Sequence, residues 1–243
     1  MEVFLALLTA LTLTAQGPLL SVAAVDTSGG SGQEAQVVSD TVAIWEANLG
    51  ARRACSAGVT VVFEDLSSRR GEYRPGSRTV AIDVGRPLSV LPATVGHELA
   101  HHTFLACGAF ADASLTEAFY AAQGLPLSRG WFDYGDGWAA TPAEHFAETM
   151  AVVTTGRSEG GIRVTAAARA VVAAWLAGAA LPAVSPPPAA PLPDRTAEAP
   201  ARDEPAREEP EMHRAGPPAT PPRAPILTLD DVGTRLVSTY YVD

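Results

Sequence analysis

Three residues have the types and the spacing that suit metal chemistry: His97, Glu98 and His101 form the motif H-E-x-x-H. On a helix, residues four positions apart lie one turn apart on the same face, so both imidazoles can reach one ion. Glu98 can then accept a proton from a water that the ion activates. The motif therefore predicts a zinc-binding helix on which Glu98 is the general base.

A catalytic zinc also needs a third protein ligand and one open position. The longer pattern H-E-x-x-H-x-x-G-x-x-H, which would supply a third histidine, is not met. Phe104 and Cys107 stand where it requires glycine and histidine. A later carboxylate is the alternative. Glu144 and Glu148 are four residues apart, so on a helix one can bind the metal while the other orients a ligand imidazole.

Other residues compete for these roles or stand near them. His145 adjoins Glu144 and could replace it as a ligand. His102 follows a ligand histidine but points about 100° away around the helix, which favours a place on the surface or behind the ligands, without metal. Asp133 and Asp136 are too few for the oxygen shell of calcium, so zinc is the only metal that we expect.

The two motifs together resemble a known family. H-E-L-A-H-H and the later segment P-A-E-H-F-A-E-T-M-A, with 42 residues between His101 and Glu144, are similar to the pattern H-E-x-x-H…E-x-x-F-A-E of the gluzincin zinc metallopeptidases. These include the catalytic domain of anthrax lethal factor and related bacterial extracellular zinc peptidases. The resemblance covers residues 91–153. It implies one Zn²⁺ per chain, Glu144 as third ligand, Glu148 as the partner of a ligand histidine and Tyr134 as the residue that stabilises the oxyanion.

Hydrophobic periodicity and chain breakers predict the elements that must position these residues. Strands are expected at residues 59–63, 70–74 and 78–84. Helices are expected at residues 33–54, 93–106, 115–123, 141–155 and 164–177. The helix that carries Glu144 has a clear start, with Thr141 as N-cap, Pro142 in the first turn and the glutamate three residues after the cap. The order predicts an α+β fold, a minimal zincin-like domain in which a small sheet packs on the H-E-x-x-H helix.

Composition limits the classes of function. The chain has 243 residues, of which 47% are hydrophobic, enough for one sizeable core. The net charge of -10 provides no basic surface for a phosphate backbone, so we expect no nucleic-acid partner. No segment is apolar for the roughly 20 residues that span a bilayer, so we expect no stable membrane insertion.

The distribution of residue types along the chain predicts secretion. An apolar N-terminal run ends in the small residues Ser21 to Ala24, with cleavage expected after Ala24. Proline is concentrated after residue 181, a composition that predicts disorder. The expected organisation is a signal peptide at 1–24, a lead-in at 25–32, the metallopeptidase domain at 33–181, a Pro-rich linker at 182–225 and a short C-terminal segment at 226–243.

Two cysteines, Cys55 and Cys107, stand outside any zinc-finger spacing. In an oxidising compartment an even pair predicts one disulfide, and two buried free thiols are the alternative. The bond would link the N-terminal helix to the end of the H-E-x-x-H helix.

The functional hypothesis is a secreted, extracellular zinc peptidase, either released or associated with the cell wall, that acts on a peptide or protein substrate. An amide in cell-wall peptide fits the same chemistry. The alternative from another class is a catalytically inactive binding module of zincin fold at the bacterial cell surface. The four residues that the chemistry needs, His97, Glu98, His101 and Glu144, are all present, which favours the enzyme.

Overall fold

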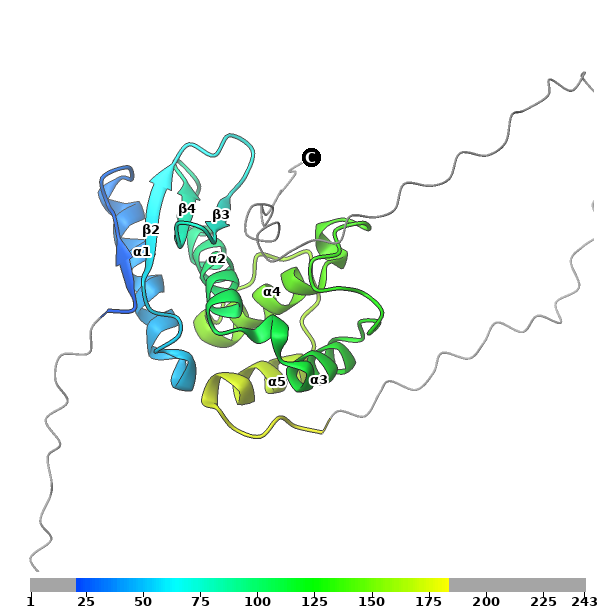
Figure 1. Ribbon diagram of the computed structural model, residues 1–243. Coiled ribbons are helices and arrows are strands. Elements are labelled where there is room, and N and C mark those ends of the chain that lie inside the picture. Colours follow the sequence, from blue (N-terminus) through cyan, green and yellow to red (C-terminus); the bar gives the residue numbers. More distant parts are fainter. Residues whose placement is uncertain (1–20, 184–243) are drawn as a thin grey trace, which may run out of the picture.

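The computed structural model describes residues 21–183, which form an α+β domain and confirm the predicted fold class (Figure 1). Its helices are α1 (Gly32–Ala47), α2 (Leu91–Ala106), α3 (Ala113–Gln123), α4 (Pro142–Thr155) and α5 (Ala166–Ala177). Three short 3-10 turns are η1 (Gly50–Arg52), η2 (Ala109–Ala111) and η3 (Trp138–Ala140). The strands are β1 (Ala23–Val25), β2 (Val59–Glu64), β3 (Gly71–Arg74) and β4 (Thr79–Asp83). Within residues 21–183, no helix is both long and apolar enough to cross a membrane.

The four strands form one mixed sheet in the order β1-β2-β4-β3. β1, β2 and β4 are parallel, and β3 runs antiparallel to β4 at the edge of the sheet. Every second residue of β2, namely Val59, Val61 and Phe63, is buried, which is the alternation of a strand that packs on one face. α1 contacts β1, whereas α2 contacts β3 and β4, so the sheet rests on these two helices (Figure 1).

β1 was not expected from the sequence. Its residues pair in parallel with β2, beginning at Ala23 opposite Val59, and Val22 and Ala23 are buried. The Glu46 carboxylate of α1 accepts the backbone N–H groups of Val22 and Ala23, at 2.7 and 2.8 Å. Small apolar residues suit both a signal-peptide end and an edge strand. The cleavage expected after Ala24 lies inside this strand, and the domain begins before the expected residue 33. Residues 1–20 lie outside the described part of the chain.

The first helix is shorter than predicted. It was expected to continue to residue 54, but α1 ends at Ala47 and a 3-10 turn begins at Gly50. Gly50 has φ +53°, a left-handed conformation that favours glycine and cannot continue an α-helix. A Cβ atom at this position would lie 2.7 Å from the Leu176 carbonyl oxygen, so the chain also passes close to α5 here.

α2 is the central element of the domain. Every residue from Ala93 to Phe104 is buried, because α1, α4, β3 and β4 all pack around this helix. Aromatic side chains fill the space behind it: the ring of Phe146 on α4 lies 5.0 Å from that of Phe104 and 5.6 Å from that of Trp175 on α5. A buried helix of this kind gives its polar side chains fixed positions in a water-poor environment.

The predicted disulfide is confirmed. Cys55 and Cys107 are bonded, with their Cα atoms 5.1 Å apart. Cys107 is the C-cap residue of α2, and Cys55 follows η1, so the bond joins the chain after α1 to the end of the central helix.

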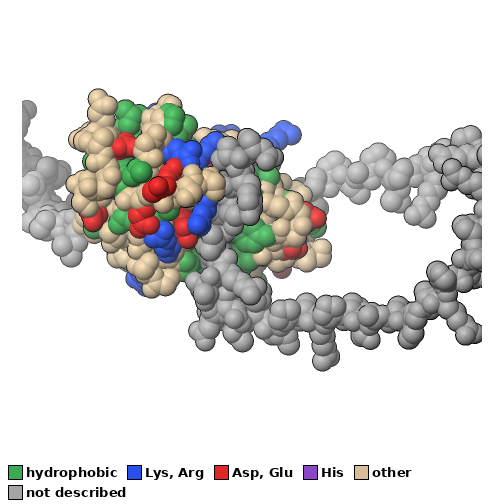
Figure 2. All heavy atoms as spheres, turned by 90° about the horizontal axis from the view of Figure 1, so that it is seen from above, with side chains coloured by type: hydrophobic (Ala, Val, Ile, Leu, Met, Phe, Trp, Pro, Cys, Tyr) green, Lys and Arg blue, Asp and Glu red, His purple; other side chains and the backbone are tan. Residues whose placement is uncertain are grey.

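Ion pairs hold the edge strand β3 in place. Arg74 of β3 donates two hydrogen bonds to the Glu64 carboxylate of β2, at 2.8 and 2.9 Å. Arg69, just before β3, pairs with Glu72 at 2.8 Å. Basic and acidic side chains are interspersed on the described part of the face in Figure 2. The Pro-rich linker beyond residue 183 and the segment 226–243 lie outside the described residues.

Candidate metal centre

α2 presents its two motif histidines to the same point. His97 and His101 lie one turn apart, and both are buried. Their Nε2 atoms are 3.0 Å apart, and the two rings meet edge to face with centroids 4.8 Å apart. Two imidazole nitrogens at this distance share a proton or a cation.

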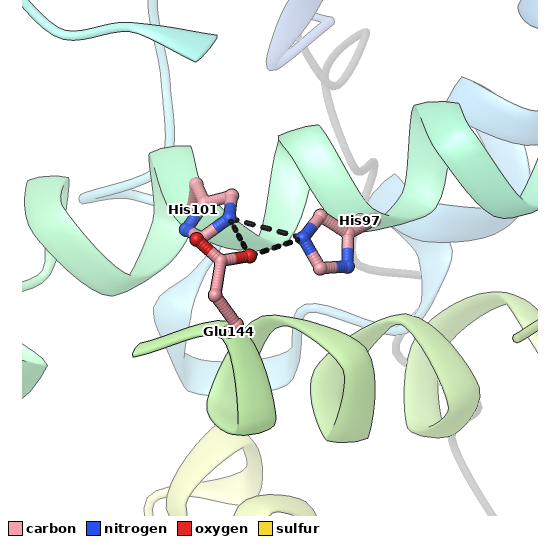
Figure 3. A group of neighbouring side chains, drawn as sticks. All are labelled: His97, His101 and Glu144. Carbon is pink, nitrogen blue, oxygen red and sulfur yellow. Dashed lines mark hydrogen bonds and ion pairs between the residues drawn. The ribbon is translucent and has the colours of Figure 1, made fainter. Parts of the chain in front are cut away.

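α4 adds the third polar group. It crosses α2 with its first turn facing the histidines, so the Glu144 side chain points between them (Figure 3). Its Oε2 atom lies 3.0 Å from Nε2 of His97 and 3.2 Å from Nε2 of His101. Ligand atoms about 2.0–2.1 Å from a tetrahedral ion lie about 3.3–3.4 Å from one another. The three atoms already form a triangle of nearly that size, and the group could hold a metal ion.

The start of α4 differs in detail from the predicted capping box. Thr141 is the N-cap residue, but its side chain makes no capping hydrogen bond. Its hydroxyl group donates instead to the Asp133 and Gly137 carbonyl oxygens of the preceding loop. Glu144 does not turn back to the N-cap because its carboxylate faces the histidines. The competing use of this glutamate at the site overrides the local motif.

The charges of the metal-free site are those of a cation-binding group. Burial alone would raise the pKa of Glu144, but the charges and hydrogen bonds of His101 and His97 hold it well below its ordinary value. Burial alone would lower the pKa of His97, but hydrogen bonds to Glu144 and Glu148 raise it well above its ordinary value. A proton therefore supplies the positive charge that the carboxylates require when no ion does.

Glu148 lies one turn further along α4, behind His97. Its Oε2 atom is 3.3 Å from His97 Nδ1, and its Oε1 atom accepts from Ser158 and from the Gly160 backbone N–H. Burial would raise its pKa, but His97 and Ser158 lower it, so the side chain is ionised. An ionised acceptor at Nδ1 fixes a proton of His97 on that nitrogen and orients Nε2 toward His101 and Glu144.

Glu98 is a buried carboxylate whose oxygens have no hydrogen-bond partner among residues 21–183. Burial is the main reason why its pKa is raised to about 8, and the nearby carboxylates of Glu159 and Glu144 raise it further. Strand β3 passes directly beside it: a Cβ atom on Gly71 would lie 2.9 Å from Glu98 Cγ. A buried polar group without a partner carries a large free-energy cost unless water or a ligand satisfies it.

The loop before α4 contributes two donors to Glu144. The Tyr134 hydroxyl donates to Oε1 at 2.8 Å, and the Trp138 indole N–H donates to Oε2 at 2.6 Å. Burial, with help from the Glu144 charge, raises the pKa of Tyr134. Tyr134, the predicted oxyanion stabiliser, is therefore brought to the site, where it contacts the carboxylate. Sequence analysis did not identify Trp138 as a site residue. The sequence offered one signal for it: an indole N–H donor lies a few residues before Glu144, in a loop rich in aromatic residues.

The other aromatic residues of this loop serve packing. The Trp131 ring stacks at 5.8 Å on Phe119 and lies 4.9 Å from Phe104, inside the core. Asp133 and Asp136, considered and rejected as calcium ligands, lie close to the Arg129 guanidinium. Arg129 also donates to the Ala140 carbonyl oxygen at 2.8 Å. This arginine therefore holds the loop both before and after the positions of Tyr134 and Trp138.

The two other histidines among residues 21–183, His102 and His145, lie apart from the triangle of ligand atoms. His102 is buried rather than on the surface: Nε2 lies 2.9 Å from the Ser56 carbonyl oxygen and Nδ1 lies 3.0 Å from the Tyr73 hydroxyl. It links α2 to β3 and to the disulfide region. His145 contacts the Gln123 amide and the Ala139 carbonyl, at 2.9 and 2.8 Å. In this arrangement neither ring replaces Glu144.

Comparison with known proteins identifies no relative, so the site is interpreted from its geometry alone. No protein family, no curated protein and no solved structure shows a significant match to the chain. The site can be described from its own residues: a buried group of two histidines and a glutamate that could hold a metal ion, with an unpartnered carboxylate beside it.

Proposed function

We propose that this chain is a secreted zinc-dependent peptidase of the gluzincin type, with His97, His101 and Glu144 as the metal ligands and Glu98 as the general base. One observation carries the proposal. Three ligand atoms from two helices converge within 3.0 to 3.2 Å of one another, and an unpartnered buried carboxylate follows the first ligand in the sequence.

The donor set favours zinc. Two imidazole nitrogens and one carboxylate oxygen are the ligands of many catalytic zinc sites, which keep a fourth position open. Calcium and magnesium prefer shells made entirely of oxygen, so the two histidines argue against them. When bound, zinc supplies a Lewis acid that polarises a carbonyl group and makes water nucleophilic at neutral pH.

Glu98 is suited to move the proton. Within residues 21–183 neither of its oxygens forms a hydrogen bond of standard geometry, so either can accept a proton from the attacking water and pass it to the leaving amine. A carboxylate in water is a weak base, and burial raises the pKa of Glu98 above its ordinary value, which makes it a stronger base. The same burial keeps bulk water from competing for the proton.

Tyr134 is the proposed oxyanion donor. Its hydroxyl group donates a hydrogen bond to Glu144 Oε1 at 2.8 Å, so it lies next to the proposed position of the ion. A donor there can turn from Glu144 to a developing negative charge on the substrate carbonyl. The Trp138 indole N–H also donates to Glu144, so this hydrogen bond can hold the carboxylate in place when the tyrosine hydroxyl turns to the substrate.

Secretion and the zincin-like arrangement belong to the same proposal. The Cys55–Cys107 bond fits an oxidising compartment. A small sheet beside the H-E-x-x-H helix, with the third ligand on a later helix, is the arrangement that the gluzincin resemblance implies. The substrate is a peptide or protein chain, or the peptide of a cell wall.

The test uses the purified full chain. We expect one zinc per chain by elemental analysis, and cleavage of a mixed peptide library by mass spectrometry, with isolated cell-wall stem peptides as a second substrate set. A chelator should abolish cleavage, added zinc should restore it, and Glu144→Ala should lose most of the zinc. A chain that binds zinc but cleaves neither set would instead support the inactive binding module.

A further inference from the structure

Residues 156–161, the first part of the connection between α4 and α5, contact residues of the metal centre at two points. Ser158 and Gly160 bind Glu148, and Gly161 packs against Trp138. Glu148 in turn contacts His97, and Trp138 contacts Glu144. One short segment therefore stands behind two of the three candidate ligands.

The first contact controls the orientation of a carboxylate. Glu148 is fully buried, and one of its oxygens faces His97 Nδ1 at 3.3 Å. The other oxygen accepts the Ser158 hydroxyl and the Gly160 N–H, the latter at 3.3 Å. The Gly160 N–H also lies 3.1 Å from the Ser158 hydroxyl oxygen, so the three groups form one small network. With both oxygens occupied, the carboxylate cannot rotate away from the imidazole without losing hydrogen bonds.

The second contact is steric. Gly161 has φ +82°, and a Cβ atom there would lie 3.1 Å from the Trp138 ring. The segment thus lies directly against the indole, whose N–H is 2.6 Å from Glu144 Oε2. A shift of the segment would reach His97 through Glu148 and Glu144 through Trp138.

We propose that residues 156–161 brace the metal centre and that Ser158 is a positioning residue, which acts on His97 through Glu148. This inference rests on the metal site of the proposed function and not on the reaction. Ser158 is exposed as a residue while its hydroxyl group satisfies a fully buried carboxylate. Its role at the site can therefore be separated from the stability of the core.

The test measures Zn²⁺ affinity of the full chain at fixed pH by competition with a chromophoric chelator. Ser158→Ala should weaken binding by up to about tenfold, the equivalent of one net hydrogen bond. Ser158→Thr keeps the hydroxyl and should bind like the parent. Ser77→Ala, at an exposed serine in the turn between β3 and β4, is the matched control and should also bind like the parent. The Co²⁺-loaded protein should show an altered absorption spectrum for the alanine variant at position 158 alone.

Two controls distinguish a failure of the Ser158 proposal from a failure of the proposed zinc site. The metal-free Ser158→Ala variant should still unfold cooperatively, with a loss of stability no larger than that expected for one hydrogen bond to a buried carboxylate. Parent-like zinc affinity in that variant would overturn the brace and leave the proposed function intact. A loss of affinity in a variant whose metal-free fold no longer unfolds cooperatively, or a loss that threonine does not restore, would also overturn it. A parent chain that binds no zinc would remove the proposed function together with this inference.

Discussion

Glu144 and Glu148 approach the same imidazole ring from opposite edges. One turn apart on α4, they lie 3.0 Å from Nε2 and 3.3 Å from Nδ1 of His97, respectively. The ring is therefore held between two carboxylates, and only the Nε2 edge also faces His101. The two glutamates of α4 therefore contact different nitrogens of His97, and this difference leads to the first prediction.

Glu144→Ala and Glu148→Ala should differ in their effect on zinc. Glu144→Ala removes a ligand and should lose most of the bound metal. Glu148→Ala leaves three ligands but frees the His97 ring, which should weaken affinity by about 10–100-fold. Chelator competition on both variants checks this order. A larger loss from Glu148→Ala than from Glu144→Ala would mean that their roles are exchanged.

The metal-free protein should lose stability as the pH rises. Folding raises the pKa of Glu98 from 4.5 to about 8, so its contribution is fully present below about pH 4.5 and is lost as the pH approaches 8. His97, whose pKa is also raised, acts in the same direction above about pH 6.5. We expect the free energy of unfolding to fall by a few kcal/mol between about pH 5 and 8.

Chemical denaturation of the metal-free protein at a series of pH values measures this change. Glu98→Gln cannot titrate, so its stability should fall less over the same range. The two pH profiles would have to differ for the account to hold, and superimposable curves would show that Glu98 is not perturbed by burial.

The disulfide should contribute strongly to stability. It closes a loop with a sequence separation of 52 residues, which the chain-entropy model converts to about 4 kcal/mol. The double variant Cys55→Ala/Cys107→Ala should therefore unfold at a much lower denaturant concentration than the parent, with zinc affinity changed far less. A difference below about 1 kcal/mol would contradict this prediction.

Strand β1 should be needed for full stability. A chain that begins at Ser21 keeps Val22 and Ala23 in the sheet and their hydrogen bonds to Glu46. A chain that begins at Val25 loses both, and should unfold more easily by about 3 kcal/mol. N-terminal sequencing of the secreted protein would show whether cleavage occurs after Ala24 or leaves the strand whole. Equal stability of the two chains would mean that β1 adds nothing.

Much of this site follows from local spacing, and the remainder does not. The pairs His97/His101 and Glu144/Glu148 each occupy one helix face, so their arrangement could be predicted from the helix period. Trp138 and Ser158 could not be predicted, because they reach the site through loops whose paths depend on tertiary packing. Thr141 is the N-cap residue that the sequence predicted, but its hydroxyl group donates to carbonyl oxygens of the loop just before the helix instead of capping the helix.

The same distinction explains the fold. The strands at 59–63 and 78–84 and the four later helices have clear periodicity and breakers, and the structure contains them within a few residues of the expected bounds. β1 is only three residues long, and it depends on a parallel partner 36 positions along the chain, Val59 opposite Ala23. Pairing over that distance leaves no local pattern in so short a strand.

The central claim is that Glu98 moves a proton during zinc-dependent hydrolysis. The most direct measurement is the cleavage rate of zinc-loaded Glu98→Gln on a peptide that the parent cleaves, with zinc content determined on the same sample. Glutamine keeps the size of the side chain but cannot accept the proton, so the rate should fall by about 10²–10⁴-fold while one zinc per chain remains. A zinc-loaded Glu98→Gln variant that cleaves at the parent rate would contradict the account.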